Sequence, residues 1–448
     1  MPAKPANLIY GVDDKPPWTV SAILGLQHVF GMSSTLVLPV VIAREVGAGF
    51  GVVQAMVCFS MIAAGLGTIL QAIHRGPVGS GYLCANLCGP SYMSVSIEAA
   101  WVGGIPLMRG MTVVAGLFEV LFSQVVHKLR SLFPPEITGL VVLMVAVSVI
   151  PLAASKFVGI DYAGDAINMK EVPIAAITLF TMIGVNIWGK GKLKLYCVLI
   201  GLVIGYIISI ATGVISHNDL ALFKEAPWFS LPGKGVKFWN FKFDWGLLIS
   251  FCVVSLCQSL KSFGNLSTCQ KINDEHWKGP NMKNIGKGLF ADGLSVSLGG
   301  FLGGMATDTS ASNVGLSAAT AATSRRIAYV AGIMFASLGF LPKMAAIFSI
   351  MPKPLMGAIL IFVICFMVIS GIQILVSSKM DTRKVFIIGI SFVFGLSAII
   401  LPDLYSGIPS WLRPIFASSL TLSTVLAILL NQLFNIGTRQ KDPSAKEK

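Results

Sequence analysis

Six ionisable side chains lie inside or at the ends of long apolar segments of this sequence. A charged side chain costs about 2.5–3.5 kcal/mol at the centre of a membrane-spanning helix, so such a residue is by default a functional hypothesis. Inside a membrane, groups of this kind mark ion, proton or substrate pathways. The six candidates are His28, Glu98, Glu119, Lys261, Asp292 and Asp308.

Lys261 follows the apolar run Trp245–Leu260 and has Gln258, Asn265 and Ser267 as polar neighbours. Its ammonium group only donates hydrogen bonds, so it favours a ligand with acceptor atoms or a negative charge. The alternative is that the long side chain extends to water at a nearby membrane surface.

Each acidic candidate has a structural alternative. Asp292 begins an apolar segment and is either a functional acid or a residue that stabilises the start of a helix. Asp308, in the polar run Thr307–Ser310, either lines a cavity or faces the outside water. Glu98 fits a solvated helix end, and Glu119 fits a buried structural hydrogen bond.

A run of small residues, Ala311-Ser312-Asn313-Val-Gly315, offers backbone donors and an amide that could bind a planar polar heterocycle. A half-helix beginning at Ala311 would point its positive end at a partly negative ligand. Close packing of helices through small residues is the alternative.

The elements that carry these residues need lipid as their solvent. The chain is 54% hydrophobic and only 12% charged, whereas soluble domains have about 25% charged residues. A spanning helix takes about 20 apolar residues. We identify fourteen apolar segments, at 19–42, 51–73, 83–98, 108–127, 137–155, 171–188, 193–215, 245–263, 287–303, 310–322, 327–349, 354–376, 385–401 and 413–436. The third and tenth are short and rich in Gly and Ser.

The two halves of the chain resemble each other. His28–Thr35 matches Lys261–Thr268 at four of eight positions, with an offset of 233 residues. Seven segments per half is an odd number, so the second half must be inverted across the membrane. Transporters with inverted repeats bind substrate near the bilayer midplane, where broken segments meet. Chance similarity of short apolar stretches is the alternative.

We therefore predict an all-α polytopic membrane protein with 14 transmembrane segments in a 7+7 inverted repeat, in which segments 3 and 10 are interrupted. The predicted parts are a cytoplasmic tail 1–18, a first repeat 19–215, an extracytoplasmic loop 216–244, a second repeat 245–436 and a cytoplasmic tail 437–448. With both termini in the cytoplasm, 21 of the 33 Lys and Arg residues fall in inside loops and 11 in outside loops. This division agrees with the positive-inside rule.

Several classes of function are excluded by the sequence. The net charge of +13 is explained by the cytoplasmic loops, so a nucleic-acid partner is not expected. The chain has no phosphate-binding loop, no metal-binding His pair and no nucleophile elbow. We expect no metal, no resident cofactor and no enzymatic activity.

At this point the sequence resembles the nucleobase–ascorbate transporter family, also called nucleobase:cation symporter family 2, over nearly its whole length. The motifs that carry the resemblance are Gln27-His28, Gly76-Pro-Val-Gly79-Ser-Gly81, Pro90-Ser91-Tyr92, Ala291-Asp292-Gly293 and Ser312-Asn313-Val-Gly315-Leu-Ser-Ala-Ala-Thr320. The resemblance implies a core domain from spans 1–4 and 8–11, a gate domain from spans 5–7 and 12–14, and a homodimer in the cell membrane. It also implies proton or sodium coupling.

The resemblance also implies a site, and this sequence departs from the family there. Lys261 stands where the family has a substrate-binding glutamate, Asn265 replaces a second titratable residue, and Ser312 replaces an acid or amide. The expected substrate contacts are Ser91, Tyr92, Lys261, Ala311, Ser312 and Asn313. The expected supporting or coupling residues are Gln27, His28, Gln258, Asn265, Asp292 and Gly315. By family analogy, Asp292 is the expected partner of Lys261.

The expected function is secondary active transport, by alternating access, of a nucleobase-like or related anionic small molecule such as xanthine, urate or uracil. Lys261 in place of the glutamate leaves two alternatives open. One is a carrier or exchanger of small organic or inorganic anions, and the other is an uncoupled uniporter.

Overall fold

The computed structural model describes residues 4–6, 8–129, 134–160, 167–189, 197–234, 240–277, 280–376, 380–405, 407–408, 416 and 419–434. The predicted C-terminal tail 437–448 lies outside these residues. The chain divides into two compact units. The first comprises residues 1–125 and 149–363, and the second comprises residues 126–148 and 364–448. The predicted core and gate domains remain a prediction.

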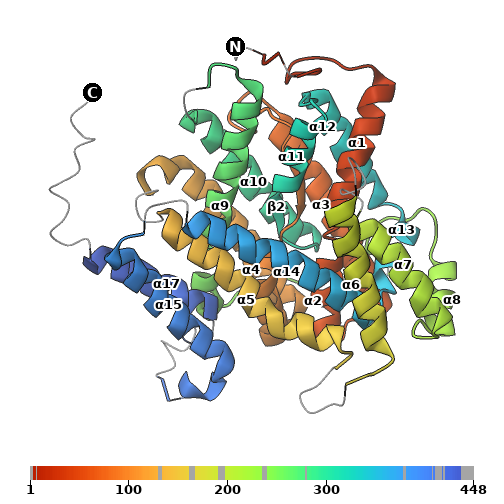
Figure 1. Ribbon diagram of the computed structural model, residues 1–448. Helices are drawn as coiled ribbons and strands as arrows, with labels where there is room; N and C mark the ends of the chain where they lie inside the picture. Colours follow the sequence, from red (N-terminus) through yellow and green to blue (C-terminus); the bar gives the residue numbers. More distant parts are fainter. Residues whose placement is uncertain are drawn as a thin grey trace, which may run out of the picture. The chain divides into compact units, whose positions relative to one another are not determined.

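The fold is built almost entirely of helices (Figure 1). The first half contains α1 (Trp18–Ser33), α2 (Val37–Glu45), α3 (Phe50–Ala72), α4 (Met93–Leu129), α5 (Pro135–Phe157), α6 (Glu171–Trp188) and α7 (Cys197–Ala211), with the 3-10 helix η1 (Pro90–Tyr92) before α4. The second half contains α8 (His217–Glu225), α9 (Trp245–Asn273), α10 (Met282–Leu302), α11 (Ala311–Ala319), α12 (Arg325–Leu338), α13 (Pro342–Ser349), α14 (Lys353–Leu375), α15 (Thr382–Ile400) and α17 (Ser419–Phe434), with the 3-10 helix η4 (Pro402–Tyr405) after α15.

Each of the fourteen predicted segments contains a helix. Within the described residues, eight helices are long and apolar enough to cross a membrane, or nine if α12 and α13, bent by 75°, form one span. Segments 3 and 4 join in α4, which bends where Gly104 adopts φ 75° and ψ −172° just before Pro106. Only glycine takes up such a conformation readily. Fourteen crossings remain a prediction.

The interrupted third and tenth segments are confirmed, and their extended parts pair with each other. The three-residue strands β1 (Asn86–Cys88) and β2 (Thr307–Thr309) run antiparallel, with Leu87 opposite Asp308. Backbone that leaves the helical pattern at membrane depth must satisfy its polar groups elsewhere. Here the two halves of the chain satisfy each other. In the described part of the chain, these strands are the departure from the predicted all-α fold.

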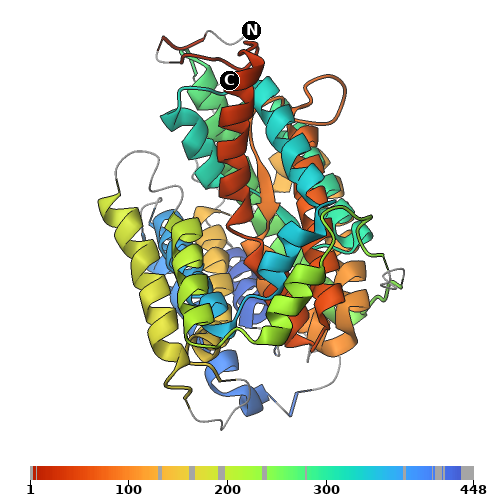
Figure 2. The same ribbon diagram turned by 90° about the vertical axis from the view of Figure 1, so that its right-hand side faces the viewer.

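Glycines let the helices of the first unit approach closely. A Cβ atom at Gly65 of α3 would lie 2.6 Å from the Gly332 carbonyl of α12. A Cβ atom at Gly293 of α10 would lie 2.8 Å from the Gly116 carbonyl of α4. These positions explain why α12 can run directly beside α3, and α10 beside α4. Figure 2 shows α12 also running alongside α1.

Two predicted boundaries need correction. Helix α9 continues to Asn273, ten residues past the predicted end of segment 8, because its polar side chains have partners inside the protein. The predicted connecting loop 216–244 contains the helix α8, whose start is fixed by a reciprocal cap between Ser216 and Asp219. Such a capping box satisfies two free backbone donors at a helix N-terminus.

The N-terminal segment is attached to the linker between α11 and α12. Thr323 donates its backbone N–H to the Tyr10 carbonyl at 2.8 Å, and Arg325 donates to the Val12 carbonyl at 3.1 Å. The Arg325 guanidinium also forms an ion pair with Asp13. We call residues 8–14 the N-terminal strap. Much of the predicted cytoplasmic tail is therefore held against the first unit.

Candidate functional site

Lys261 lies in the middle of α9, not at its end, and forms an ion pair with Asp308 of β2. Its Nζ atom lies 2.5 Å from the Asp308 Oδ2 atom. The Asp308 side chain is fully buried, whereas 27% of the Lys261 side chain is exposed. The alternative of a lysine that merely extends to surface water is therefore wrong, because its ammonium group has a buried carboxylate as partner.

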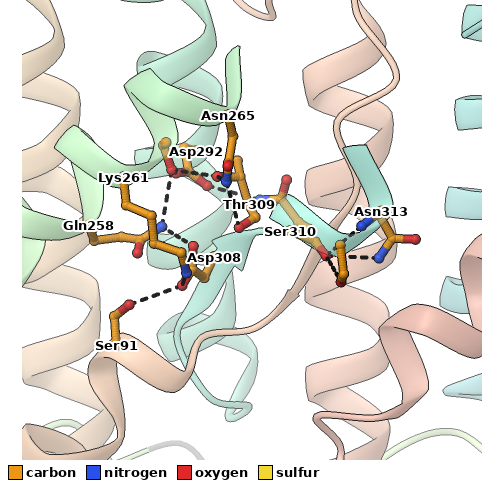
Figure 3. A network of polar contacts seen from close by, with 12 residues as sticks. Ser91, Gln258, Lys261, Asn265, Asp292, Asp308, Thr309, Ser310 and Asn313 are labelled. Atoms are coloured by element: carbon orange, nitrogen blue, oxygen red, sulfur yellow. Dashed lines mark hydrogen bonds and ion pairs between the residues drawn. The ribbon is translucent and has the colours of Figure 1, made fainter. Parts of the chain in front are cut away.

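Two further side chains donate hydrogen bonds to the same carboxylate (Figure 3). Gln258, one turn before Lys261 on α9, donates from Nε2 to Asp308 Oδ1. Ser91 of η1 donates to Asp308 Oδ2 at 3.1 Å. Asp308 thus accepts from one charged and two neutral donors. Of the two sequence alternatives for Asp308, exposure to outside water is wrong.

Asp292 is not the hydrogen-bond partner of Lys261, which corrects the expectation from the resemblance. Its Oδ2 atom accepts from Ser262 at 2.5 Å and its Oδ1 atom accepts from Asn86 at 3.0 Å. Asp292 is fully buried on α10. It therefore connects α10 to α9 and to β1, one layer behind the Lys261–Asp308 pair.

Asn265 holds the end of β2 from one turn beyond Lys261. Its Nδ2 atom donates to the Thr309 carbonyl at 3.1 Å and to the Thr309 hydroxyl at 2.9 Å. The Ser262 hydroxyl lies 2.7 Å from that same hydroxyl. The polar face of α9 is thus satisfied by β2, which holds Asp308 of β2 against Lys261.

The start of α11 is fixed by side chains from both halves. Ser310 is its N-cap and accepts from the Asn313 N–H at 3.2 Å and from Asn313 Nδ2 at 2.9 Å. His28 of α1 places Nδ1 2.8 Å from Asn313 Oδ1. The Ser312 hydroxyl oxygen lies 3.0 Å from the Ser310 hydroxyl oxygen. Figure 3 shows Ser310 and Asn313 following directly from Asp308 and Thr309.

The exposure of the predicted site residues divides them into two groups. Ala311, Ser312 and Gly315 are exposed on α11, and Ser91 is half-buried beside Asp308. The predicted supporting residues Gln27, His28, Gln258, Asn265 and Asp292 are buried, and so are Asn313 and Tyr92. Tyr92 and Asn313 therefore lie behind the exposed surface in this structure, whereas Lys261 and Ser312 lie at it.

Glu119 has the structural role that its position in segment 4 indicated. Its Oε1 atom accepts from Ser259 of α9 at 2.9 Å, and the side chain is fully buried. The sequence leaves two alternatives open for Asp308 and does not place it among the predicted site residues. The signal that could have found it is a carboxylate directly before the interrupted tenth segment.

Among the described residues, no group of His, Cys, Asp and Glu could hold a metal ion.

The sequence model of the Permease family, Xan_ur_permease, matches residues 20–404. The chain belongs to this xanthine/uracil permease family. It is 32% identical over 432 residues to a putative purine permease of Clostridium perfringens, covering 95% of this chain and 92% of that protein. It is 24% identical over 444 residues to the xanthine permease XanP of Escherichia coli, covering 96% and 95% of the two chains. Members of the family are permeases and not enzymes.

Solved structures confirm the fold. The transmembrane domain of the cyanobacterial bicarbonate transporter BicA has a TM-score of 0.57 at 14% identity, covering 91% of this chain and 97% of that one. The murine anion transporter Slc26a9 has a TM-score of 0.58 at 11% identity, covering 96% and 70%. These proteins share the 7+7 inverted-repeat fold. The chain is therefore a multi-pass membrane permease with that architecture.

Proposed function

We propose that this permease is a secondary active transporter of nucleobase-like anions, such as urate or deprotonated xanthine, coupled to an ion gradient through alternating access. The observation that carries the proposal is the Lys261 side chain, 27% exposed, on a helix that packs against both β2 and α11, whose residues Ala311 and Ser312 are exposed. Relatives in the same family are named as purine, xanthine and uric acid permeases. We further propose that the permease is a homodimer and that both of its termini lie in the cytoplasm.

The chemistry of Lys261 supports an anion over a neutral base. An ammonium donates hydrogen bonds and accepts none, so a neutral base would offer it only carbonyl or ring-nitrogen acceptors. A deprotonated base adds a negative charge, so Coulomb attraction to the ammonium is added to the hydrogen bond. The start of α11 contributes the positive end of a helix dipole on the same side.

Ser312 supports recognition of the rest of the ring. Its hydroxyl both donates and accepts, so it can bond either a carbonyl or an N–H group of a heterocycle. Ser91 supplies a second hydroxyl, half-buried next to Asp308. Together with Lys261 these groups match a ligand that has one anionic edge and one mixed polar edge.

Uptake into proteoliposomes tests the proposal. The purified protein is reconstituted and supplied with labelled urate, xanthine, uracil, ascorbate and bicarbonate, with and without proton or sodium gradients. We expect saturable accumulation of urate or xanthine that collapses when the gradient is dissipated. Gradient-independent equilibration would favour a uniporter. Accumulation of bicarbonate but no nucleobase would favour a carrier of inorganic anions.

A further inference from the structure

We propose that Asp308 is an internal competitor of the substrate: an anion binds by replacing the Asp308 carboxylate on Lys261, and Asp308 takes up one proton from water as it is displaced. This inference rests on the proposed function. The carboxylate gains an O–H bond, and the Lys261 ammonium keeps its three N–H bonds and exchanges one anionic partner, Asp308, for another, the substrate. Entry of one anion together with one proton leaves the charge of the site unchanged.

The geometry makes Lys261 the accessible member of the pair. Asp308 is fully buried, whereas 27% of the Lys261 side chain is exposed. An anion that arrives from water therefore meets the Lys261 side chain before the Asp308 carboxylate. Because the ammonium is already bonded to Asp308 Oδ2, the anion has to compete with this carboxylate for its donor.

Displacement leaves Asp308 in surroundings that disfavour a negative charge. Its remaining donors, Gln258 and Ser91, are both neutral. The titratable groups that interact with Asp308 from the surrounding elements are Lys261 of α9, Asp292 of α10, Glu119 of α4, Tyr92 of η1 and Cys84 before β1. Apart from Lys261 none of them is a cation. A buried carboxylate that loses its cation is costly, so neutralisation by a proton accompanies the exchange.

Gln258 is suited to both states of Asp308. Its amide nitrogen donates to the carboxylate and, at 3.1 Å, to the Ser262 hydroxyl, while its Oε1 atom is buried without a hydrogen-bond partner. A buried acceptor without a donor costs about 1–3 kcal/mol. A rotation of the amide presents Oε1 to a protonated Asp308, whose O–H then donates to it. The amide thus supplies a donor to the charged form and an acceptor to the neutral form.

The test measures urate binding and proton uptake together on the purified full-length protein. Calorimetric titrations in buffers of different ionisation enthalpy give the number of protons taken up with each urate, from about pH 6 to about pH 8. We expect about one proton per urate for the wild type. The apparent Kd should then rise about tenfold per pH unit toward high pH.

The variant Asp308→Asn mimics the protonated acid. We expect it to bind urate with no proton uptake and with a Kd that no longer depends on pH. Glu119→Gln neutralises another buried carboxyl that does not touch the Lys261–Asp308 pair, and should keep the proton uptake. Proton uptake that persists in Asp308→Asn, or disappears in Glu119→Gln instead, would overturn the inference.

If Asp308→Asn does not fold, proton uptake on urate binding to the wild type alone still tests the inference. Tight urate binding without proton uptake would overturn the role of Asp308 while leaving the proposed function intact. Absence of binding of urate and of xanthine to the wild type would remove the proposed function and this inference together.

Discussion

The Nδ1 atom of His28 lies 2.8 Å from the Asn313 Oδ1 atom, so a helix of the first half is bonded to the first turn of α11 in the second half. The Asn313 amide nitrogen donates to Ser310, which assigns Oδ1 as the atom that faces the imidazole. His28 therefore donates from Nδ1–H in its neutral form. The imidazole holds α11 in position and is not itself exposed.

Substitution of His28 should reveal this role. His28→Asn places an amide donor near the position of Nδ1, so we expect it to keep most of the substrate affinity. His28→Ala leaves Asn313 with an unsatisfied buried acceptor, which costs about 1–3 kcal/mol and should weaken binding about tenfold. Binding titrations of both variants check this. Equal losses in both would show that the imidazole contributes more than the Nδ1 donor.

Removal of the Lys261 charge should abolish tight binding of an anion. Lys261→Gln keeps length and some hydrogen bonding, but it leaves Asp308 buried without its cation, and breaking a buried pair costs about 3–5 kcal/mol. The double variant Lys261→Gln/Asp308→Asn should recover thermal stability without recovering urate binding. Urate affinity close to wild type in either variant would contradict the role of the ammonium.

Loss of the Ser310 cap should weaken the start of α11. Ser310→Ala removes the acceptor of the Asn313 N–H, and replacement of an N-cap serine by alanine typically costs about 1 kcal/mol. Ser310→Thr keeps the hydroxyl and serves as the matched control. We expect faster amide exchange in residues 312–314 for the alanine variant alone, measured by mass spectrometry. Unchanged exchange in Ser310→Ala would argue against capping.

Gly65 should tolerate no side chain, because its would-be Cβ atom meets backbone atoms of α12 at 2.6 Å. Overpacking of this kind costs about 1–3 kcal/mol, so Gly65→Ala should lower the melting temperature of the detergent-solubilised protein. Gly389 of α15 is exposed and has nothing within 4 Å of its would-be Cβ. Gly389→Ala should keep or raise the melting temperature. The reverse order would disprove the close α3–α12 packing.

The N-terminal strap should respond to acid through Asp14. Hydrogen bonds from Lys4 and from the Gly11 N–H hold the pKa of the Asp14 carboxyl below its ordinary value of 3.8. A lowered folded-state pKa stabilises the strap above pH 3.8, and this contribution is lost as the pH falls through the folded-state value. The side chains of Lys4 and Asp14 are both more than 40% exposed, so their ion pair stabilises the strap by less than about 1 kcal/mol.

Comparison of variants at one pH isolates this effect. Asp14→Asn should speed amide exchange of residues 8–12 by no more than about fivefold at neutral pH. The difference from wild type should vanish as the pH falls below the folded-state pKa of Asp14, where its carboxyl is protonated and as uncharged as the asparagine amide. Asp219→Asn, which changes the α8 cap, should leave the strap unaffected. A difference that grows toward low pH would contradict this sign.

The sequence predicted most of the residues that meet at the site, because ionisable groups in apolar segments are costly enough to mark it. His28, Lys261 and Asp292 stand out in this way, whereas Asn313 stands out through the run of small residues around it. It did not predict that Lys261 pairs with Asp308, since that depends on the register of β1 and β2 and on the rotation of α9 about its axis. Neither quantity is readable from local composition.

The depth of Lys261 could not be predicted for a related reason. The part of α9 after Leu260 is polar, so the apolar pattern of the sequence ends there. In the structure Ser262, Asn265, Gln270 and Asn273 are buried and bonded to neighbouring segments. Hydropathy measures the preference of a side chain for lipid, whereas these residues face protein.

The pairing of β1 with β2 has a mechanical consequence. Each strand belongs to a different repeat, and each satisfies the backbone groups of the other where water is absent. Spreading the repeats apart at this point would orphan those groups at several kcal/mol each. We therefore expect the two interrupted segments to move as one rigid unit during a transport cycle. The access path to the substrate then has to open at an interface other than β1–β2, and the substrate stays in contact with both repeats.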